Sequence, residues 1–462
     1  MQQFSTGVKG LDIVLCGGLR VGSSVLIEGA PGSGKTTLGV QTIVEGVKAG
    51  DPGIILTFEQ FPDQIYRDSA RYGWDLPTME RENKLKVICT SPQVINDQLL
   101  QVSGPINQLI KNIGAKRILI DSFTHFRRIS MEETNLRELM FSLMNSLKQR
   151  GLTVLFTKEF SPVEAESFEE YLVDTIISLT YQETPTEGRR RLVEVLKSRG
   201  HEHLPGKHSF KFSSEGLQVF PRHLPQIDEI NELKVLPGVL PTGIEGLDSL
   251  LGGGVPNGSN ILLCGPAGVG KTTLSLQTIH NALQDRSRKA VLFLHEEMPE
   301  YILRRAESFG WDFRKFIEQG QLIIKYEDFI QIDIDEYLLK LNEMMQAVGP
   351  SLVVVDTLPT LMHNVSHDIQ LVAEKIARLT RVIKYHRCNS LLISPSTFGA
   401  KQIGRFGFEE SFCDGVIILG TVSFEDARKR HIEVYKLRNQ KHITGLHRME
   451  ITEEGIRIFY VR

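Results

Sequence analysis

A short segment near the N-terminus combines the residue types that hold a nucleotide phosphate. Residues 29–36 read G-A-P-G-S-G-K-T and follow the apolar run 25–27. The glycines allow backbone N–H groups to point into the loop, and the helix that follows adds its positive end. Lys35 is placed to reach the terminal phosphates, and Thr36 offers a hydroxyl to Mg²⁺. A strand before the loop and an amphipathic helix after it favour a P-loop over an accidental glycine-rich turn.

The same pattern occurs a second time. Residues 265–272 read G-P-A-G-V-G-K-T after the apolar run 261–263, and Lys271 lies 236 positions after Lys35 (271 − 35). Two such loops with matching flanks indicate a duplicated nucleotide-binding protein. The loop residues expected to contact nucleotide are Gly32, Ser33, Gly34, Lys35, Thr36 and Thr37 in the first copy and Gly268, Val269, Gly270, Lys271, Thr272 and Thr273 in the second.

In both copies, an apolar strand ends in an aspartate. The run 117–120 leads to Asp121, and the run 352–355 leads to Asp356. A strand that delivers a carboxylate beside a P-loop is the arrangement that holds Mg²⁺ through water. A single strand-end aspartate could be ordinary, but two at matching offsets favour a metal role. The expected metal ligands are therefore Thr36, Asp121, Thr272 and Asp356.

The elements that position these residues are expected to form one sheet in each copy. Strands alternate with helices, including helices at 38–49 and 274–283, which predicts an α/β fold with a mostly parallel sheet covered on both faces. Ligands then bind at the carboxyl ends of the strands. We expect one domain at 1–222, a second at 240–462, and a linker at 223–239, since prolines bound a polar stretch there. A linker this short favours stacked domains.

The composition narrows the class of protein. The chain has 462 residues, 41% of them hydrophobic and 24% charged, with a formal net charge of −3. Because it has no global basic character, a strong nonspecific nucleic-acid binder is not favoured. The five cysteines form no C-x-x-C pair, which fits a reducing cytoplasm. The sequence contains neither a secretory h-region nor an apolar run of membrane-spanning length, so we expect a cytoplasmic protein.

Taken together, the motifs resemble the KaiC family of ATPases. Besides the P-loops, the resemblance rests on T-G-x-x-G-L-D at 6–12 and 242–248, the strand-end acids, G-W-D at 73–75 and 310–312, and the K-x-R segments at 197–199 and 436–438. It covers essentially the whole chain. It implies two tandem RecA-like domains, stacked in a double ring, that use ATP and Mg²⁺. It also implies self-association as a homo-hexamer, with nucleotide at the subunit interfaces.

The resemblance also assigns roles beyond the P-loops. Glu59 and the pair Glu296 and Glu297 are expected to polarise the attacking water, which requires a carboxylate one water away from the γ-phosphate. Basic segments are expected to reach the nucleotide of a neighbouring subunit, with Arg199 and Arg438 acting as arginine fingers. A basic edge strand kept soluble by its charge is the alternative. The residues of these segments are Lys197, Ser198, Arg199 and His203 in the first copy and Lys436, Leu437, Arg438 and His442 in the second.

The sequence departs from the family pattern at two places. In the first copy, Gln60 follows Glu59, so the acidic pair of the family has become a single carboxylate. In the second copy, clock-type members carry adjacent Ser and Thr phosphorylation sites, and here the segment holds Glu410 and Ser411. Glu410 could mimic a permanent phosphate, which leaves Ser411 as the candidate phosphoacceptor.

We therefore expect an ATP-hydrolysing ring that acts as a slow conformational switch for regulatory or signalling protein partners, with Ser/Thr autokinase activity in the second domain as an additional hypothesis. The main alternative is a RecA/RadA-type nucleic-acid-dependent ATPase, a recombinase or helicase motor. Such proteins usually add a DNA-binding module, which this chain lacks. A nucleotide-bound scaffold without turnover is a third hypothesis, which the intact acids argue against.

Overall fold

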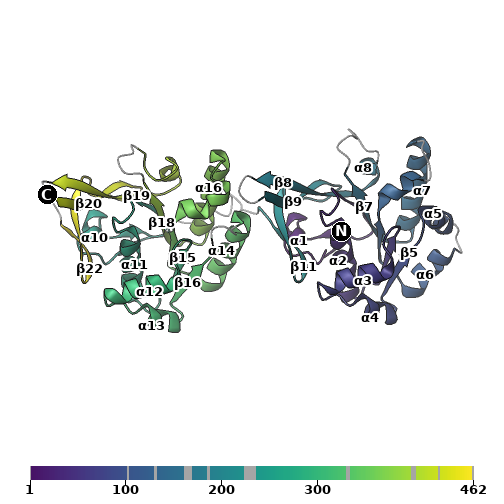
Figure 1. Cartoon of the computed structure of the whole chain (residues 1–462), viewed down its shortest axis with the longest axis horizontal. Helices are drawn as coiled ribbons and strands as arrows, with labels where there is room; N and C mark the ends of the chain where they lie inside the picture. The colour runs from purple at the N-terminus through teal and green to yellow at the C-terminus, as the bar shows by residue number, and fades with distance from the viewer. Residues whose placement is uncertain are drawn as a thin grey trace. The chain divides into compact units, whose positions relative to one another are not determined.

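The computed structural model describes residues 2–100, 104–128, 133–160, 169–184, 188–222, 236–328, 333–396, 402–424 and 427–459. The chain divides into two compact units, residues 1–223 and 224–462, which Figure 1 colours from purple to teal and from teal to yellow. The segment expected to be a linker falls mostly on residues 223–235, outside the described residues.

The first unit begins with a short hairpin and helix and then alternates strands with helices before ending in antiparallel strands. Its elements are β1 (Gln3–Phe4), α1 (Leu11–Val14), β2 (Leu19–Arg20), β3 (Ser24–Gly29), α2 (Lys35–Lys48), β4 (Gly53–Thr57), α3 (Pro62–Ala70), α4 (Leu76–Arg81), β5 (Leu85–Cys89), α5 (Pro92–Leu100), α6 (Pro105–Ile113), β6 (Arg117–Asp121), η1 (Phe123–Arg128), α7 (Glu133–Gln149), β7 (Thr153–Glu159), α8 (Glu169–Leu172), β8 (Thr175–Thr184), β9 (Gly188–Ser198), β10 (His208–Ser213) and β11 (Gly216–Phe220).

The second unit repeats this order. Its elements are β12 (Val239–Leu240), α10 (Leu247–Leu250), β13 (Val255–Pro256), β14 (Asn260–Gly265), α11 (Lys271–Ala282), β15 (Ala290–Leu294), α12 (Pro299–Ser308), α13 (Phe313–Glu318), β16 (Leu322–Tyr326), α14 (Ile334–Val348), β17 (Leu352–Asp356), α15 (Leu358–Leu361), η3 (His363–Val365), α16 (Ile369–Tyr385), β18 (Asn389–Pro395), η4 (Glu409–Ser411), β19 (Gly415–Phe424), β20 (Ala427–Leu437), β21 (His447–Thr452) and β22 (Gly455–Phe459).

Each unit is built on a nine-stranded, mostly parallel sheet, as the sequence predicts. The strand order is β11-β10-β9-β8-β3-β7-β6-β4-β5 in the first unit, and the second unit has the corresponding order β22-β21-β20-β19-β14-β18-β17-β15-β16. Strands β8, β3, β7, β6, β4 and β5 run parallel, while β9, β10 and β11 add antiparallel pairings at one edge. The fold is therefore a pair of tandem RecA-like α/β domains.

Helices cover both faces of each sheet because alternate strand residues point to opposite sides. In β3, Val25 and Ile27 pack with α2 in one cluster, whereas Leu26 packs with α7 in another. Strand β14 shows the same alternation between Ile261 and Leu262. Both faces of the central strands are thus apolar, which leaves the carboxyl ends of the strands as the place for polar side chains.

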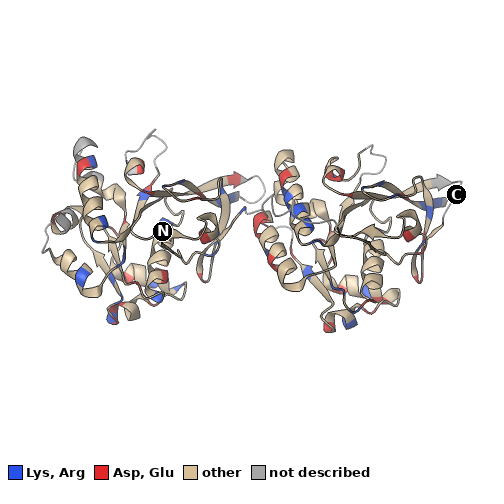
Figure 2. Ribbon diagram, turned by 180° about the vertical axis from the view of Figure 1, so that it is seen from behind, with Lys and Arg blue, Asp and Glu red and all other residues tan. Residues whose placement is uncertain are grey.

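Three of the cysteines are buried, and all five are free thiols. In the part of the chain that the structure describes, no helix combines the length and apolar character needed to cross a bilayer. Basic and acidic residues are interspersed on both units in the view of Figure 2.

Candidate nucleotide-binding sites

The first P-loop joins β3 to α2, and its backbone depends on glycine. Gly32 and Gly34 have φ values of +75° and +108°, which side chains with a Cβ rarely adopt. A Cβ at Gly34 would also lie 2.6 Å from the ring of Phe212. The helix α2 begins at Lys35, three residues earlier than the sequence pattern predicts. The loop therefore presents backbone N–H groups at a helix N-terminus, the geometry that suits a phosphate.

The P-loop lysine of the first unit turns back onto its own loop. Lys35 Nζ donates hydrogen bonds to the carbonyl oxygens of Gly29, at 2.9 Å, and Ala30, at 3.0 Å. Burial lowers the pKa of Lys35, while the charges of Glu159 and Asp121 act in the opposite direction. A buried ammonium held by two neutral carbonyls is poorly compensated. An anionic phosphate would be a stronger partner than these carbonyls.

The second P-loop, between β14 and α11, repeats this geometry closely. Gly268 and Gly270 have φ values of +75° and +116°. Lys271 Nζ donates to the carbonyl oxygens of Gly265, at 2.8 Å, and Pro266, at 2.9 Å. Burial again lowers the pKa of the lysine. Two independent stretches of chain thus reach the same loop conformation from the same pattern of glycines.

A threonine and an aspartate meet beside each P-loop. Thr36 Oγ1 donates to Asp121 Oδ2 at 2.8 Å, and Thr272 Oγ1 donates to Asp356 Oδ2 at the same distance. The peptide bond after each of these aspartates is cis. Burial raises the pKa of Asp356 to about 6, and the nearby charges of Glu296 and Glu297 act in the same direction.

The threonine–aspartate pairs fit a magnesium ion whose remaining coordination positions are filled by water and phosphate oxygens. Hydroxyl and carboxylate oxygens are hard ligands, which Mg²⁺ prefers, and Mg²⁺ is usually bound by one or two protein groups together with substrate phosphates. Among the described residues, no group of three or more His, Cys, Asp or Glu could enclose a metal. The chain offers Thr36 with Asp121 and Thr272 with Asp356 for this ion.

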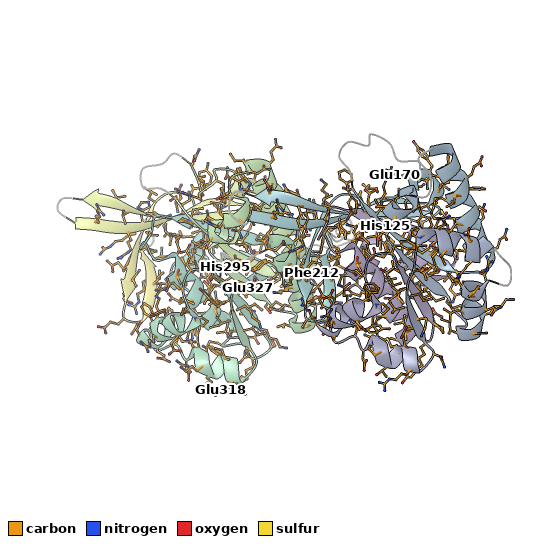
Figure 3. The ribbon with its side chains drawn as sticks, turned by 45° about the vertical axis from the view of Figure 1, so that its right-hand side comes forward. His125, Glu170, Phe212, His295, Glu318 and Glu327 are labelled. Atoms are coloured by element: carbon orange, nitrogen blue, oxygen red, sulfur yellow. The ribbon has the colours of Figure 1, made fainter. Side chains whose placement is uncertain are left out.

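The strand-end glutamate of the first unit contacts a histidine that the sequence analysis did not single out. Glu59 follows β4, and its Oε1 lies 3.1 Å from Nε2 of His125 on η1. The glutamate side chain is mostly exposed, whereas the histidine is mostly buried and its ring lies edge-on to Phe58. Figure 3 labels His125 in the first unit. Register brings the two segments together, since Thr57 on β4 pairs with Asp121 on β6.

In the second unit the corresponding glutamate is held by hydroxyl groups. Oε1 of Glu296 accepts a hydrogen bond from Thr357 at 3.0 Å and a second one from Thr360. Glu297 is engaged elsewhere, in a two-pronged ion pair with Arg305 in which Nη2 and Oε2 are 2.8 Å apart. The two acids that the sequence suggests as equivalent thus have different partners. Of the two, only Glu296 bonds to the residues that follow Asp356.

A cavity of about 310 Å³ lies beside the first P-loop. It combines the loop and the start of α2 with aromatic side chains, and it continues to Gln60 and Asp68. Trp74 is buried, as expected of a core residue, but it also lines this cavity. The complete lining is Gly32, Gly34, Lys35, Thr36, Thr37, Val40, Gln60, Ile65, Asp68, Ser69, Tyr72, Trp74 and Phe212. Its size and its aromatic walls suit the base and sugar of a nucleotide.

In the second unit, the positions that match Gln60 and Asp68 are Glu297 and Arg305, the residues of the ion pair. A different cavity, of about 570 Å³, lies on the side of Glu296 and is lined by Glu296, Pro359, Thr360, His363, Ser366, Pro395, Ser396, Arg405 and Phe406. The surroundings of the two P-loops therefore differ although the loops themselves match.

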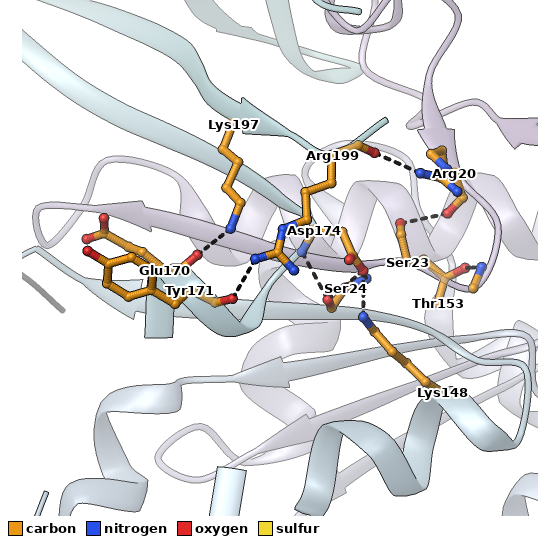
Figure 4. Close-up of polar contacts among 11 residues, drawn as sticks. Arg20, Ser23, Ser24, Lys148, Thr153, Glu170, Tyr171, Asp174, Lys197 and Arg199 are labelled. Carbon is orange, nitrogen blue, oxygen red and sulfur yellow. Dashed lines mark hydrogen bonds and ion pairs between the residues drawn. The ribbon is translucent and has the colours of Figure 1, made fainter. Parts of the chain in front are cut away.

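The basic segments contact the backbone of their own unit (Figure 4). Lys197 Nζ donates to the carbonyl oxygen of Glu170 at 2.7 Å, and Arg199 Nη2 donates to that of Tyr171 at 2.9 Å. In the second unit, Lys436 Nζ donates to the carbonyl oxygens of Glu410 and Cys413. Burial, and then the charge of the neighbouring arginine, lowers the pKa of Lys197 and of Lys436.

The remaining residues of these segments lie near the end of the same strands. Ser198 and Leu437 are ladder residues, paired with Thr175 and Gly415. His203 and His442 are partly buried, and Arg199 and Arg438 are exposed. Among the described residues, the hydrogen bonds of these basic side chains go to backbone carbonyl groups outside the P-loops.

The candidate phosphoacceptor lies in the short helix η4. Ser411 is exposed, and its backbone N–H donates to Phe408. The preceding Glu409 is fully buried and accepts hydrogen bonds from four successive backbone N–H groups, those of residues 405–408. Glu410 is partly buried and also supplies the carbonyl that binds Lys436. The serine thus extends from a segment that a buried carboxylate holds in place.

Two aromatic residues that touch the first P-loop were missed by the sequence analysis. Tyr181 on β8 donates its hydroxyl to the carbonyl oxygen of Gly32 at 2.7 Å. Phe212 on β10 lines the cavity and lies close to Gly34. Both come from strands far along the chain, so no local motif marks them.

Two tandem α/β units, each with a P-loop and a strand-end aspartate, define a duplicated P-loop ATPase of RecA-like fold. Comparison with protein families identifies the family of this ATPase. The KaiC ATPase family model matches residues 4–223 and again residues 240–461. The chain belongs to the KaiC family of ATPases, and membership of this family implies nucleotide binding.

Individual relatives align over nearly the whole chain. The chain is 30% identical over 476 residues to the circadian clock oscillator protein KaiC of Parasynechococcus marenigrum (strain WH8102), which covers 99% of this chain and 90% of the relative. It is 29% identical to the protein of the same name from Synechococcus elongatus, over 97% of this chain and 88% of the relative. It is also 27% identical to the circadian clock protein KaiC3 of Synechocystis, over 99% of this chain and 92% of the relative.

Proposed function

We propose that both units bind ATP with Mg²⁺ and hydrolyse it. The observation that carries this proposal is the repeated combination of a buried P-loop lysine, a threonine–aspartate pair and a strand-end glutamate. Mg²⁺, when bound, neutralises charge on the phosphates. The chain itself supplies the phosphate cradle, two oxygen ligands for the ion, and a carboxylate for the attacking water.

Each of these residues has a defined part in this scheme. Lys35 and Lys271 exchange their loop carbonyls for phosphate oxygens, which satisfies a buried ammonium with an anion. Glu59 and Glu296 polarise the water, since both are exposed acids at the carboxyl end of the sheet. Between the two acids of the second unit, we assign this role to Glu296 because Arg305 already engages Glu297. In the first unit, Gln60 lies at the position of Glu297, so a single acid remains there as well. This agrees with assigning the role to Glu296.

We further propose that copies of the chain assemble into a homo-hexameric ring with nucleotide between neighbouring subunits. Family membership supports this assembly, and the exposed Arg199 and Arg438 are available to a neighbour's site. The residues that would accompany these arginines at the neighbour's site are Lys197, Ser198 and His203 from the first unit and Lys436, Leu437 and His442 from the second. An arginine finger supplied in trans stabilises charge that develops on the transferred phosphate. Turnover is then slow outside the ring, and the ring acts as a conformational switch for regulatory protein partners.

Autophosphorylation of Ser411 is a further part of the proposal. The hydroxyl is exposed on η4, and the clock-protein relatives motivate the idea. The interspersed charges in Figure 2 and the net charge of −3 do not favour the nucleic-acid-dependent motor as an alternative.

Incubation with γ-labelled ATP tests these proposals together. Released phosphate and protein-bound label are followed in the wild type, in Ser411→Ala and in Glu59→Gln/Glu296→Gln. We expect phosphate release that requires the two glutamates, and any protein label to disappear in Ser411→Ala. Phosphate release that is unchanged in the glutamate double variant would refute the hydrolytic assignment. Strong stimulation by single-stranded DNA would favour the motor.

A further inference from the structure

The two units hold their strand-end glutamates with different chemical groups at the same position of the repeat. Asp121 and Asp356 occupy equivalent strand ends, and the residues four positions later are His125 and Thr360. Each of these contacts the glutamate of its own unit: His125 Nε2 lies 3.1 Å from Glu59, and the Thr360 hydroxyl bonds to Glu296. The position is thus a shared support for the glutamate, filled by an imidazole in one unit and a hydroxyl in the other.

The imidazole is well placed to fix the carboxylate. Its side chain is about 10% exposed, while that of Glu59 is 66% exposed. The ring is packed against Phe58, and the backbone N–H of His125 donates to the carbonyl oxygen of Ser122, just before η1. A carboxylate can only accept at this contact, so Nε2 carries the proton that bridges them. An exposed acid is therefore held by a mostly buried group at one of its oxygens.

We propose that His125 is the positioning residue of Glu59. This inference rests on the proposed hydrolytic function and identifies what holds its base in place. The contact fixes one oxygen of an exposed carboxylate, so its loss should let the carboxylate turn away from the attacking water.

The second unit supplies a matched control, because it also has a histidine beside its glutamate in the sequence. His295 directly precedes Glu296, at the position of Phe58 in the first unit. Its ring is buried edge-on against Tyr337, and burial lowers its pKa to about 4, so it stays uncharged near neutral pH. Figure 3 labels it in the second unit. Nearness in sequence alone therefore does not make a histidine the support of the glutamate.

The test isolates each site in the full-length chain. Lys271→Ala leaves the first site as the source of phosphate release, and Lys35→Ala leaves the second. In the Lys271→Ala background, His125→Ala should lower kcat about tenfold with little change in KM, since misplacement of a catalytic group reduces rate and not ground-state binding. His125→Gln keeps a hydrogen-bond donor and should restore part of the rate.

The matched change in the second unit is Thr360→Ala in the Lys35→Ala background, which should lower kcat in the same way, whereas His295→Phe should change kcat little. Binding of a fluorescent ATP analogue and the unfolding temperature report on folding, and His125→Gln carries the test if His125→Ala does not fold. An unchanged kcat in His125→Ala, or a loss of rate that His125→Gln does not restore in part, would overturn the inference. A Lys271→Ala parent that releases no phosphate would instead show that the first site does not turn over independently of the second, which removes the basis for this role.

Discussion

The two P-loops of this chain have nearly the same geometry, whereas the residues around them differ. Lys35 and Lys271 make the same two carbonyl contacts, and the threonine–aspartate distance is 2.8 Å in both units. Around this frame, the first unit has an open cavity with Gln60 and Asp68, and the second has the Glu297–Arg305 ion pair. The residues proposed to bind phosphate and metal therefore keep one geometry in both units, while the residues around them differ.

The P-loop lysines, which make the same contacts in both units, should give the largest effect on turnover when they are replaced. Lys35→Ala and Lys271→Ala should each abolish turnover at their own site, by more than about 100-fold, because each removes the charge that meets the terminal phosphates. ATP binding and phosphate release measured for each variant check this. Lys48→Ala, at the exposed far end of α2, is the control and should leave turnover unchanged. If one lysine variant abolished turnover at both sites, the sites could not be treated as separate.

The two units also differ in how they bury charge. Asp335 on α14 lies 2.6 Å from both Lys375 and Arg378 on α16, and the aspartate and the lysine are fully buried. Asp335→Asn should destabilise the second unit by about 3–5 kcal/mol, because it removes the buried anion of two buried cations and leaves them only the half-exposed Glu374, 3.7 Å away. Chemical unfolding followed by limited proteolysis would show which unit melts first.

The control is Asp51→Asn in the first unit, where Asp51 pairs with Arg117 but is 43% exposed. The loss of unfolding free energy in Asp51→Asn should be clearly smaller than in Asp335→Asn, since solvent screens an exposed partner. Equal losses in the two variants would contradict the contrast between the two units.

Asp356, the proposed metal ligand of the second site, should reduce stability at neutral pH. Because burial raises the folded-state pKa of Asp356 from 3.8 to about 6, ionising it costs free energy in the folded state. Stability is therefore lost as pH rises from about 4 to about 6, and it stays lower above that. Asp356→Asn should stabilise the nucleotide-free, metal-free protein above pH 6 by up to about 3 kcal/mol. The gain should vanish near pH 4, and a gain independent of pH would exclude this cause.

The smallest expected effect concerns the ion pair that distinguishes the second site. Arg305→Ala should speed nucleotide release from this site about two- to fivefold, since a half-exposed pair contributes at most about 1 kcal/mol. Stopped-flow release of a fluorescent nucleotide from the Lys35→Ala background measures it. Arg304→Ala, the neighbouring exposed arginine, is the matched control. A slower release in Arg305→Ala would mean that the pair does not restrict the site.

The sequence alone predicts the P-loops and the strand-end acids of both units, including the single acid beside Gln60, but it misses the contacts that these residues make. The P-loops, Asp121 and Asp356 are recognisable because each lies in a short motif that follows an apolar strand. Contacts such as Glu59 with His125, or Tyr181 with Gly32, join residues 66 and 149 positions apart and follow no periodic pattern. The mostly parallel sheet is likewise predictable from alternating strands and helices. The strand order and the antiparallel edge depend on tertiary packing that no local pattern records.

The central claim, that two separate glutamates drive hydrolysis at two sites, is tested most directly by measuring phosphate release and bound nucleotide in Glu59→Gln, Glu296→Gln and the double variant. We predict that each single variant keeps its nucleotide but loses the turnover of one site, and that the double variant binds ATP without releasing phosphate. Turnover in the double variant at the wild-type rate would contradict the account.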